Sequence, residues 1–194
     1  MSGPAEALER HVADSLSGLE IEALRDAARI GDIGSGAGFP GLALALALPA
    51  ASVDLIESAR RKTAVIARLA TAADTANART VTARAEEWAV GEGACAYGAV
   101  TARAVAALPV LVEYAAPLLE LGGTFVAWKG IRDRAEEAAG ARAASTVGLT
   151  PGPVVSVKPF PAARDRHLHT FVKSAPTPAR FPRRAGMAAK RPLT

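Results

Sequence analysis

The sequence predicts an α/β fold: a mostly parallel sheet of the seven-stranded type, with helices on both faces and an antiparallel hairpin at its end. Three features of the chain predict it. Short apolar runs alternate with longer alanine-rich runs as far as residue 148. A glycine-rich turn joins the first apolar run to the first alanine-rich run. After residue 148, two apolar runs are joined by the six residues PAARDR, too few for a crossover helix, so they should pair antiparallel.

Each expected element follows from the spacing of apolar residues and from the residues that flank them. Short apolar runs predict strands, and longer alanine-rich runs predict helices. Pro40 falls in the first turn of the first expected helix, where proline is well tolerated. The expected strands are 29–33, 52–57, 79–83, 97–103, 123–129, 154–160 and 167–173, and the expected helices are 40–48, 59–73, 109–119 and 132–146.

Length and composition favour a single domain with a basic end. With 194 residues, half of them apolar, the chain is long enough for one hydrophobic core and too short for two. We expect the domain to cover residues 1–174 and a basic Pro/Arg tail to cover 175–194. Residues 1–157 carry 14 Lys and Arg against 18 Asp and Glu, whereas residues 158–194 carry 9 against 1. This asymmetry is typical of a protein that approaches a polyanion, with an ordinary solvated tail as the alternative.

No targeting or membrane segment is expected. Acidic residues stand where a secretory signal needs a basic and then an apolar run, and the one cysteine, Cys95, has no partner for an internal disulfide. The longest apolar run is interrupted by Pro40 and Pro49 and is shorter than the roughly 18 residues typical of a membrane span. We therefore expect a cytoplasmic monomer that binds no membrane and no metal.

The turn DIGSGAGFPG, residues 32–41, is the main functional signal. A glycine-rich turn between a strand and a helix lets a ligand approach the backbone closely. The dinucleotide pattern G-x-G-x-x-G needs a glycine where Phe39 stands, and a phosphate-binding loop would end in G-K-S or G-K-T. The remaining pattern, D-x-G-x-G-x-G, is used for S-adenosylmethionine. Asp32 would then face the ammonium group of the methionine part.

Glu57 adds a second and less specific signal. It ends the second expected strand, 23 residues after Gly34, where an acid accepts both ribose hydroxyls of an adenosine. Nicotinamide-dependent oxidoreductases use an acid at the same place, so an NAD enzyme stays open as an alternative. The simplest non-functional interpretation is a solvated acid that caps the next helix.

Several motifs along the chain together resemble one family. They are GSGAGFPG, LIESARRK, ARAEEW, TARAVAAL, GGTFVAWKG and FPRRAGMAAKRPL. In this order and spacing they resemble the bacterial RsmG (GidB) methyltransferases, from about residue 11 to residue 193. The resemblance implies a class I, Rossmann-like methyltransferase. It also implies that S-adenosylmethionine is the methyl donor and that N7 of one guanine in the decoding-region loop of 16S ribosomal RNA is the acceptor.

The resemblance implies site residues as well. His11 and Asp14, in the segment H-x-x-D-S, would lie one helical turn apart near the methyl-transfer site. Ala85 and Glu86 would flank the adenine, where an apolar wall and a backbone N–H are sufficient. For the cofactor the implied residues are Asp32, Gly34, Gly36, Phe39, Glu57, Ala85, Glu86 and Arg103; for catalysis His11, Asp14, Arg84 and Arg103; for rRNA Arg84, Lys129, Arg166, Arg183 and Arg184.

The chemistry of methyl transfer favours guanine N7 on separate grounds. Methylation of a pyrimidine carbon usually uses a thiolate, and Cys95 lies in the loop GEGACAYG, away from the expected strand ends. Methylation of an exocyclic amine typically uses an N/D-P-P-Y/F/W loop after the fourth strand, where this chain reads TARAVAAL. Guanine N7 has a lone pair and no proton, so it needs no general base. Arg103 or Arg84 would orient the ring through O6 or a phosphate.

The tail is expected to follow an RNA backbone as an extended segment. Its basic residues alternate with Pro and Gly, so we expect no packed element and a steep loss of RNA binding with salt. These residues are Arg180, Arg183, Arg184, Lys190 and Arg191. Aromatic residues make up only 5% of the chain, which argues against an exposed base-stacking platform.

The chain departs from the family pattern at two places. Family members usually have a few dozen helical residues, including an N-L-T segment, before H-x-x-D-S, so either the true start lies upstream or this chain lacks part of the wall over the cofactor and rRNA cleft. A non-catalytic rRNA-binding protein therefore stays open as a second alternative. Trp128 stands where smaller apolar residues are common in the family.

Overall fold

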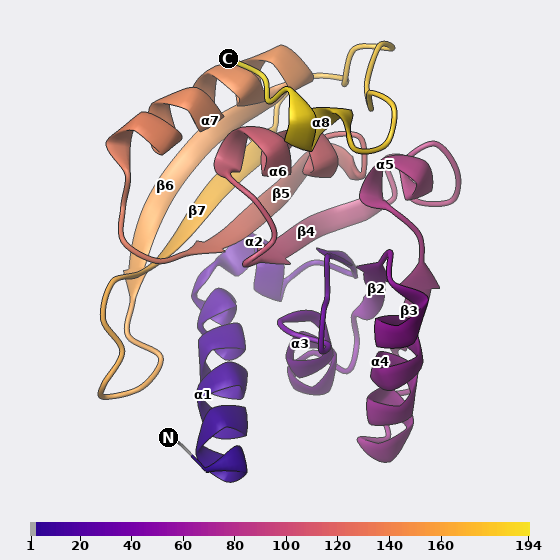
Figure 1. Ribbon diagram of the computed structural model, residues 1–194, viewed down its shortest axis with the longest axis vertical. Helices are drawn as coiled ribbons and strands as arrows, with labels where there is room; N and C mark the ends of the chain where they lie inside the picture. The colour runs from indigo at the N-terminus through magenta and orange to yellow at the C-terminus, as the bar shows by residue number, and fades with distance from the viewer. Residues whose placement is uncertain (1–2) are drawn as a thin grey trace.

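The computed structural model describes residues 3–194 and has a single seven-stranded sheet between two layers of helices (Figure 1). The strand order is β3-β2-β1-β4-β5-β7-β6. The strands are β1 (Arg29–Ile33), β2 (Ser52–Glu57), β3 (Ala78–Thr82), β4 (Tyr97–Arg103), β5 (Leu119–Lys129), β6 (Leu149–Val157) and β7 (Arg166–Lys173). The helices are α1 (Pro4–Leu16), α2 (Glu22–Arg25), α3 (Gly41–Ala47), α4 (Arg60–Ala72), α5 (Ala85–Trp88), α6 (Leu108–Ala115), α7 (Arg134–Val147) and α8 (Met187–Lys190), with a 3-10 turn η1 (Ser17–Glu20) after α1.

Strand pairing places the carboxyl ends of the central strands at one edge of the sheet. β1 pairs in parallel with β2 and β4, and β3 and β5 extend the parallel part on either side. β7 runs antiparallel between β5 and β6, which confirms the predicted hairpin. The chain order reverses between β1 and β4. In open α/β sheets the crevice beyond the strand ends at such a reversal is the usual ligand site.

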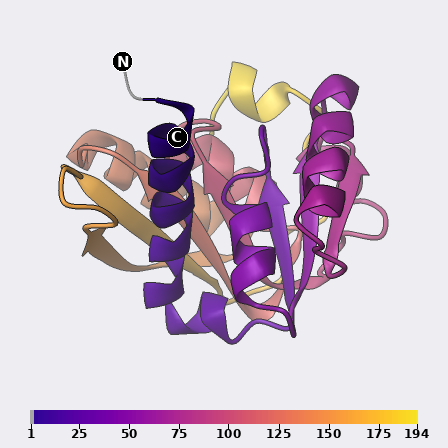
Figure 2. The same ribbon diagram turned by 90° about the horizontal axis from the view of Figure 1, so that it is seen from below.

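Each face of the sheet has its own apolar core. On one face, α3 and α4 cover the sheet, and Leu55 of β2 and Ile66 of α4 are fully buried there. On the other face, α5, α6 and α7 cover the sheet, with Tyr97 of β4 and Leu111 of α6 buried between them, and α8 packs on α6 (Figure 1). α1 lies beside α3 and completes the first layer (Figure 2). No helix within residues 3–194 is long and apolar enough to cross a bilayer.

The predicted bounds of β1, β2 and β4 are confirmed, whereas the predicted end of α6 is wrong. Helix was expected as far as residue 119, but α6 ends at Ala115 and β5 begins at Leu119. Pro117 explains the difference, because a proline has no N–H to continue the helical hydrogen bonds, which end with the bond from the Ala116 N–H to the Val112 carbonyl oxygen. Leu119 instead pairs with Tyr97 of β4 and is fully buried in the sheet.

The C-terminal segment also differs from the expectation. The absence of a packed element after residue 174 is a wrong prediction, because the segment contains α8, which packs against α6. Phe181 and Ala188 are buried, and Leu193 packs against the same core. These three apolar side chains stand among prolines and arginines, so the composition of the segment hides them. The basic end of the chain is therefore docked on the sheet's second layer.

Candidate active site

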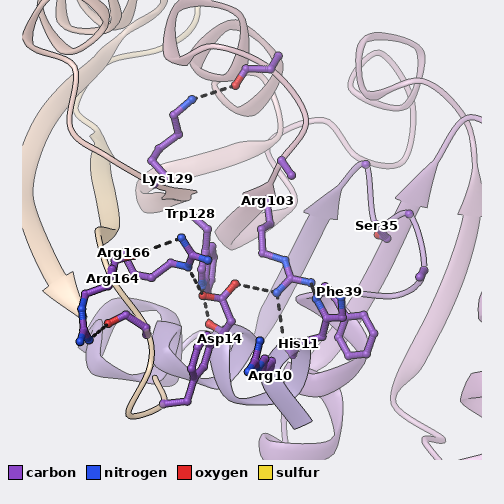
Figure 3. Close-up of a pocket in the computed structure, with 18 of the residues that line it drawn as sticks. Arg10, His11, Asp14, Ser35, Phe39, Arg103, Trp128, Lys129, Arg164 and Arg166 are labelled. Atoms are coloured by element: carbon purple, nitrogen blue, oxygen red, sulfur yellow. Dashed lines mark hydrogen bonds and ion pairs between the residues drawn. The ribbon is translucent and has the colours of Figure 1, made fainter. Parts of the chain in front are cut away.

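A cavity of about 1130 Å³ opens at the carboxyl ends of β1, β4 and β5 (Figure 3). Its walls come from α1, the turn after β1, the β4–α6 loop and the β6–β7 connection. The predicted site residues that line it are His11, Asp14, Gly34, Gly36, Phe39, Arg103, Lys129 and Arg166. The fold thus brings segments far apart in the sequence to the crevice where the strand order reverses.

The glycine turn forms a backbone wall of the cavity. The N–H of Gly34 (φ 66°) donates to the Ile56 carbonyl oxygen at 2.8 Å, which fixes the turn to β2. A Cβ on Gly34 would lie 2.7 Å from Val105, so a glycine here lets the β4–α6 loop close against the turn. A Cβ on Gly36 would meet only the Gly34 carbonyl oxygen, at 3.7 Å. The concave side of the turn is therefore open to a ligand that approaches the backbone.

Asp32 lies beneath this turn and does not line the cavity. Its side chain is fully buried, and its oxygens accept hydrogen bonds from the Thr101 hydroxyl at 2.8 Å and the Gly41 N–H at 3.1 Å. Burial raises the pKa of Asp32 to about 6, and the hydrogen bonds limit the rise. The carboxylate faces Gly41 at the start of α3 and Thr101 of β4, and not the cavity where a ligand ammonium group was expected. Here it fixes the two ends of the turn.

Glu57 ends β2 beside the same turn. One carboxylate oxygen accepts from the Gly36 N–H at 3.2 Å, and the other from the Ala59 N–H at 2.8 Å. Each oxygen keeps a second lone pair for a ligand hydroxyl. Lys62, on α4, lies 3.8 Å from Glu57 and lines the cavity. Sequence reasoning did not single out Lys62, although the run ARRK directly after the acid was a usable signal.

His11, Asp14, Phe39 and Arg103 form one cluster, although 92 residues separate the first and last (Figure 3). Arg103 donates to an Asp14 carboxylate oxygen at 2.8 Å and to the His11 carbonyl oxygen at 3.3 Å. Its guanidinium lies 5.5 Å from the centre of the Phe39 ring, which stacks on the His11 ring at 5.6 Å. The predicted one-turn spacing of His11 and Asp14 on a helix is confirmed. Arg103 is thus held by several partners between α1 and the glycine turn.

Asp14 also connects α1 to the far wall of the cavity. Its second carboxylate oxygen lies 3.5 Å from the Arg166 Nε in an ion pair without a hydrogen bond, and it has no other partner among residues 3–194. The Trp128 indole N–H donates to the Asp14 carbonyl oxygen at 2.8 Å. A Cβ on Gly18 would lie 2.3 Å from the Trp128 ring, so the large side chain fits because position 18 is glycine. Trp128 therefore fastens α1 to β5.

Lys129 lines the cavity, but its charge is already paired. Its Nζ lies 2.7 Å from a Glu136 carboxylate oxygen and donates to the Ala106 carbonyl oxygen at 3.3 Å. The same Glu136 oxygen accepts from the Leu108 N–H at 2.8 Å. Lys129 and Glu136 thus hold the β4–α6 loop where it enters α6. A role of Lys129 at rRNA phosphate would require this pair to open.

Three further cavity residues were missed from the sequence. Arg10 lies 5.7 Å from the centre of the Phe160 ring, and both line the cavity on the side of the β6–β7 connection. Arg164, in the same connection, donates to the carbonyl oxygen of Ala163. The only signal for them was proximity, because Arg10 precedes His11 and Arg164 lies two residues from Arg166.

The other predicted residues lie outside this cavity. Arg84 is exposed at the start of α5, and Ala85 and Glu86 are buried directly after it. Arg183 is ion-paired with Glu113, and Arg184 is exposed. The turn that carries residues 84–86 follows β3, so along the carboxyl edge of the sheet it lies next to Glu57 of β2, with β1 between β2 and the strand that ends at Arg103. No group of metal-ligating side chains is found in the described part of the chain.

Comparison with known sequences gives a consistent result. A family model described as GidB, rRNA small subunit methyltransferase G, matches residues 1–168. A Rubrobacter xylanophilus protein named ribosomal RNA small subunit methyltransferase G is 42% identical, over 98% of this chain and 74% of that protein. A Roseiflexus castenholzii protein of the same name is also 42% identical, over 97% of this chain and 80% of its own length.

Solved structures agree with the fold. A predicted O-methyltransferase from Agrobacterium tumefaciens superposes with a TM-score of 0.65 at 21% identity, over 85% of this chain and 81% of that one. Aeropyrum pernix fibrillarin, crystallised with bound S-adenosyl-L-methionine, gives a TM-score of 0.63 at 16% identity, over 84% and 74% of the two chains. At these identities the likeness establishes a class I methyltransferase fold.

Proposed function

The chain belongs to the rRNA small subunit methyltransferase G family, and from this premise we propose that it methylates N7 of one guanine in the decoding-region loop of 16S ribosomal RNA, with S-adenosylmethionine as donor. The observation that carries the proposal is the contact between the Arg103 cluster and the glycine turn at the point where the strand order reverses. At this point a site for the methyl donor and a site for the acceptor base would share one wall. Family membership also argues against the alternative of an NAD-dependent oxidoreductase.

The residues present fit the cofactor. The open, backbone-lined side of the turn at Gly34 and Gly36 suits a ligand part that lacks phosphates, and residues 34–41 contain no Lys or Arg. Glu57 lies next to this turn with free lone pairs for ribose hydroxyls. S-adenosylmethionine, when bound, supplies a methyl group on a positively charged sulfur. We assign Asp32 to holding the turn, because its carboxylate is fully buried beneath it.

The acceptor base needs orientation and the exclusion of water more than it needs a proton acceptor. The N7 lone pair of guanine is available at neutral pH, so in-line attack requires two reacting atoms held about 3–3.5 Å apart. We assign Arg103 to the guanine O6, because a donor at N7 would block the reacting lone pair. Asp14, Phe39 and the His11 carbonyl hold the Arg103 guanidinium in place. His11 and Asp14 then act as positioning residues.

The outer part of the cavity suits a polyanion. Arg10, Arg164 and Arg166 line it. The Arg166 guanidinium has an ion pair with Asp14 that lacks a hydrogen bond and a long hydrogen bond of 3.4 Å to the Arg164 carbonyl oxygen, so it keeps donors for a phosphate. We therefore assign Arg166, with Arg10 and Arg164, to the rRNA backbone. The substrate is 16S rRNA or the small subunit that contains it, which implies a cytoplasmic protein, and we propose that one copy of the chain is sufficient.

The proposal is tested by methyl transfer to small subunits from cells that lack this gene. We expect one methyl group per subunit, located by mass spectrometry on N7 of one guanine of the decoding-region loop. A reconstituted subunit with 7-deazaguanine at that position should accept no methyl group. Calorimetry should give heat with S-adenosylhomocysteine and none with NAD. Binding of the subunit without methyl transfer would favour the non-catalytic alternative instead.

A further inference from the structure

The docked C-terminal segment is held by an ion pair inside the second helical layer. The Arg183 guanidinium binds the Glu113 carboxylate of α6 through two nitrogens, at 2.7 Å and 2.5 Å. Glu113 is fully buried, so its charge depends on this partner. Arg183 also donates to the Arg191 carbonyl oxygen at 2.8 Å, which closes residues 183–191 into a loop. Phe181, two residues before that loop, is buried in the core.

This loop contacts the turn after β3 directly. The Gly186 N–H, inside the loop closed by Arg183, donates to a Glu86 carboxylate oxygen at 2.8 Å. Glu86 is the second residue of α5 and is buried. The C-terminal segment therefore touches the rest of the chain at two buried acids, Glu113 and Glu86, that lie on different helices.

The turn after β3 lies next to the ribose acid. Glu57 and Thr82 are register partners at the ends of β2 and β3, and α5 begins at Ala85, three residues after Thr82. A nucleoside with its ribose at Glu57 and its methionine part at the glycine turn extends its base away from β1, toward β3. Ala85 and Glu86 are the residues that such a base reaches. The contact at Gly186 therefore supports the adenine end of the cofactor site.

We propose that Arg183 is a positioning residue for the cofactor: by docking the C-terminal segment on Glu113, it holds Gly186 against Glu86 and so fixes the wall that the adenine contacts. This inference rests on the proposed cofactor. It replaces an RNA-backbone role for Arg183, whose guanidinium is already engaged by a buried carboxylate and a backbone carbonyl. Arg184, the next residue, is exposed and remains available to RNA.

The test compares Arg183→Met with Arg184→Met in the full-length chain. For Arg183→Met we expect the calorimetric Kd for S-adenosylhomocysteine to rise at least tenfold. The KM for S-adenosylmethionine should rise equally, with kcat at saturation within twofold of wild type. Amide hydrogen exchange should become faster at residues 85–88 and stay unchanged at residues 33–41. The salt slope of RNA binding should not change.

Arg184→Met is the matched control. It should leave the Kd for S-adenosylhomocysteine within twofold of wild type and reduce the slope of log K for RNA against log salt by about 0.7 to 0.9, as for one phosphate contact. Val126→Ala, a fully buried change in the other core, controls for general loss of stability and should not alter the cofactor Kd. If Arg183→Met does not fold, the double variant Arg183→Met with Glu113→Leu removes both charges and is measured in its place.

A folded Arg183 variant with a cofactor Kd within twofold of wild type overturns the inference. So does an Arg183 variant that lowers the salt slope as Arg184→Met does, because that result places Arg183 on RNA. Both outcomes require that the wild-type chain binds S-adenosylhomocysteine. Absence of that binding contradicts the proposed function itself, so the two failures are distinguishable.

Discussion

The two halves of the cleft are built in different ways. In the turn half, the carboxylates of Asp32 and Glu57 are buried and accept hydrogen bonds from backbone N–H groups. In the acceptor half, Arg103 and Arg166 meet Asp14 through ion pairs, with side chains 14% and 42% exposed. Buried backbone contacts hold one shape, whereas the more exposed ion pair of Arg166 weakens with salt. The difference suits a constant cofactor on one side and a polyanion that docks and leaves on the other.

The largest expected effect comes from replacing Arg103, which should impair the acceptor half of the cleft and leave the turn half intact. We expect Arg103→Ala to lower the rate of methyl transfer at saturating cofactor by about 10²- to 10³-fold, because the acceptor base loses its orienting donor. The Kd for S-adenosylhomocysteine should stay within threefold, since the turn half is held by its own contacts. Single-turnover kinetics and calorimetry measure the two quantities. Arg103→Lys should remain slow, because lysine lacks the fork that spans Asp14 and the His11 carbonyl. A wild-type rate in either variant removes Arg103 from the acceptor site.

A smaller effect tests the buried carboxylate of the turn half. The pKa of Asp32 is about 6 in the folded chain against 3.8 in the unfolded chain, so between these values the folded state binds the extra proton. Stability therefore falls as pH rises from about 4 to about 6, by about 3 kcal/mol in total. Asp32→Asn removes this proton uptake. The free energy of unfolding of the variant minus that of wild type should therefore rise by about 3 kcal/mol between pH 4 and pH 7.

Urea titrations at each pH measure that difference, in which the other carboxylates cancel. Asp26→Asn, a change at an exposed aspartate on α2's carboxyl end, controls for the loss of one carboxylate. A difference between Asp32→Asn and wild type that stays constant with pH contradicts the assigned burial of the charge.

The smallest effect is expected at Arg166. Arg166→Ala should weaken RNA binding severalfold and reduce the salt slope by about 0.7 to 0.9, because one phosphate contact is lost. The cofactor Kd should not change. Arg25→Ala removes an arginine on α2, before the start of β1 and away from the cavity, and should alter neither quantity. An unchanged salt slope for Arg166→Ala would show that its pairing with Asp14 persists in the complex.

The parallel sheet was predictable because its strands are buried on both faces. Such strands read as apolar runs between turns, so the bounds of β1, β2 and β4 followed directly from the sequence. The end of α6 did not, because the leucines around Pro117 are equally typical of helix and of buried strand. Pro117 was the residue that indicated where the helix ends.

Site residues were predictable from the sequence where their role depends on where the fold places them. They were not predictable where the role depends on which side chain pairs with their charge. His11, Phe39 and Arg103 come together because the sheet topology places the ends of their segments at one crevice. The engagement of Lys129 by Glu136 and of Arg183 by Glu113 depends on side-chain contacts over 7 and 70 residues. A charge count along the chain treats both cations as available. Their partners lie on helices whose facing residues the sequence pattern does not specify.

The fit of Trp128 over Gly18 links two positions that are distant in the sequence. The indole fills the volume that any Cβ at position 18 would need, and its N–H holds the carbonyl of Asp14. We therefore expect these two positions to change together: a relative with a larger residue in place of the glycine should carry a smaller ring or an aliphatic chain in place of the tryptophan.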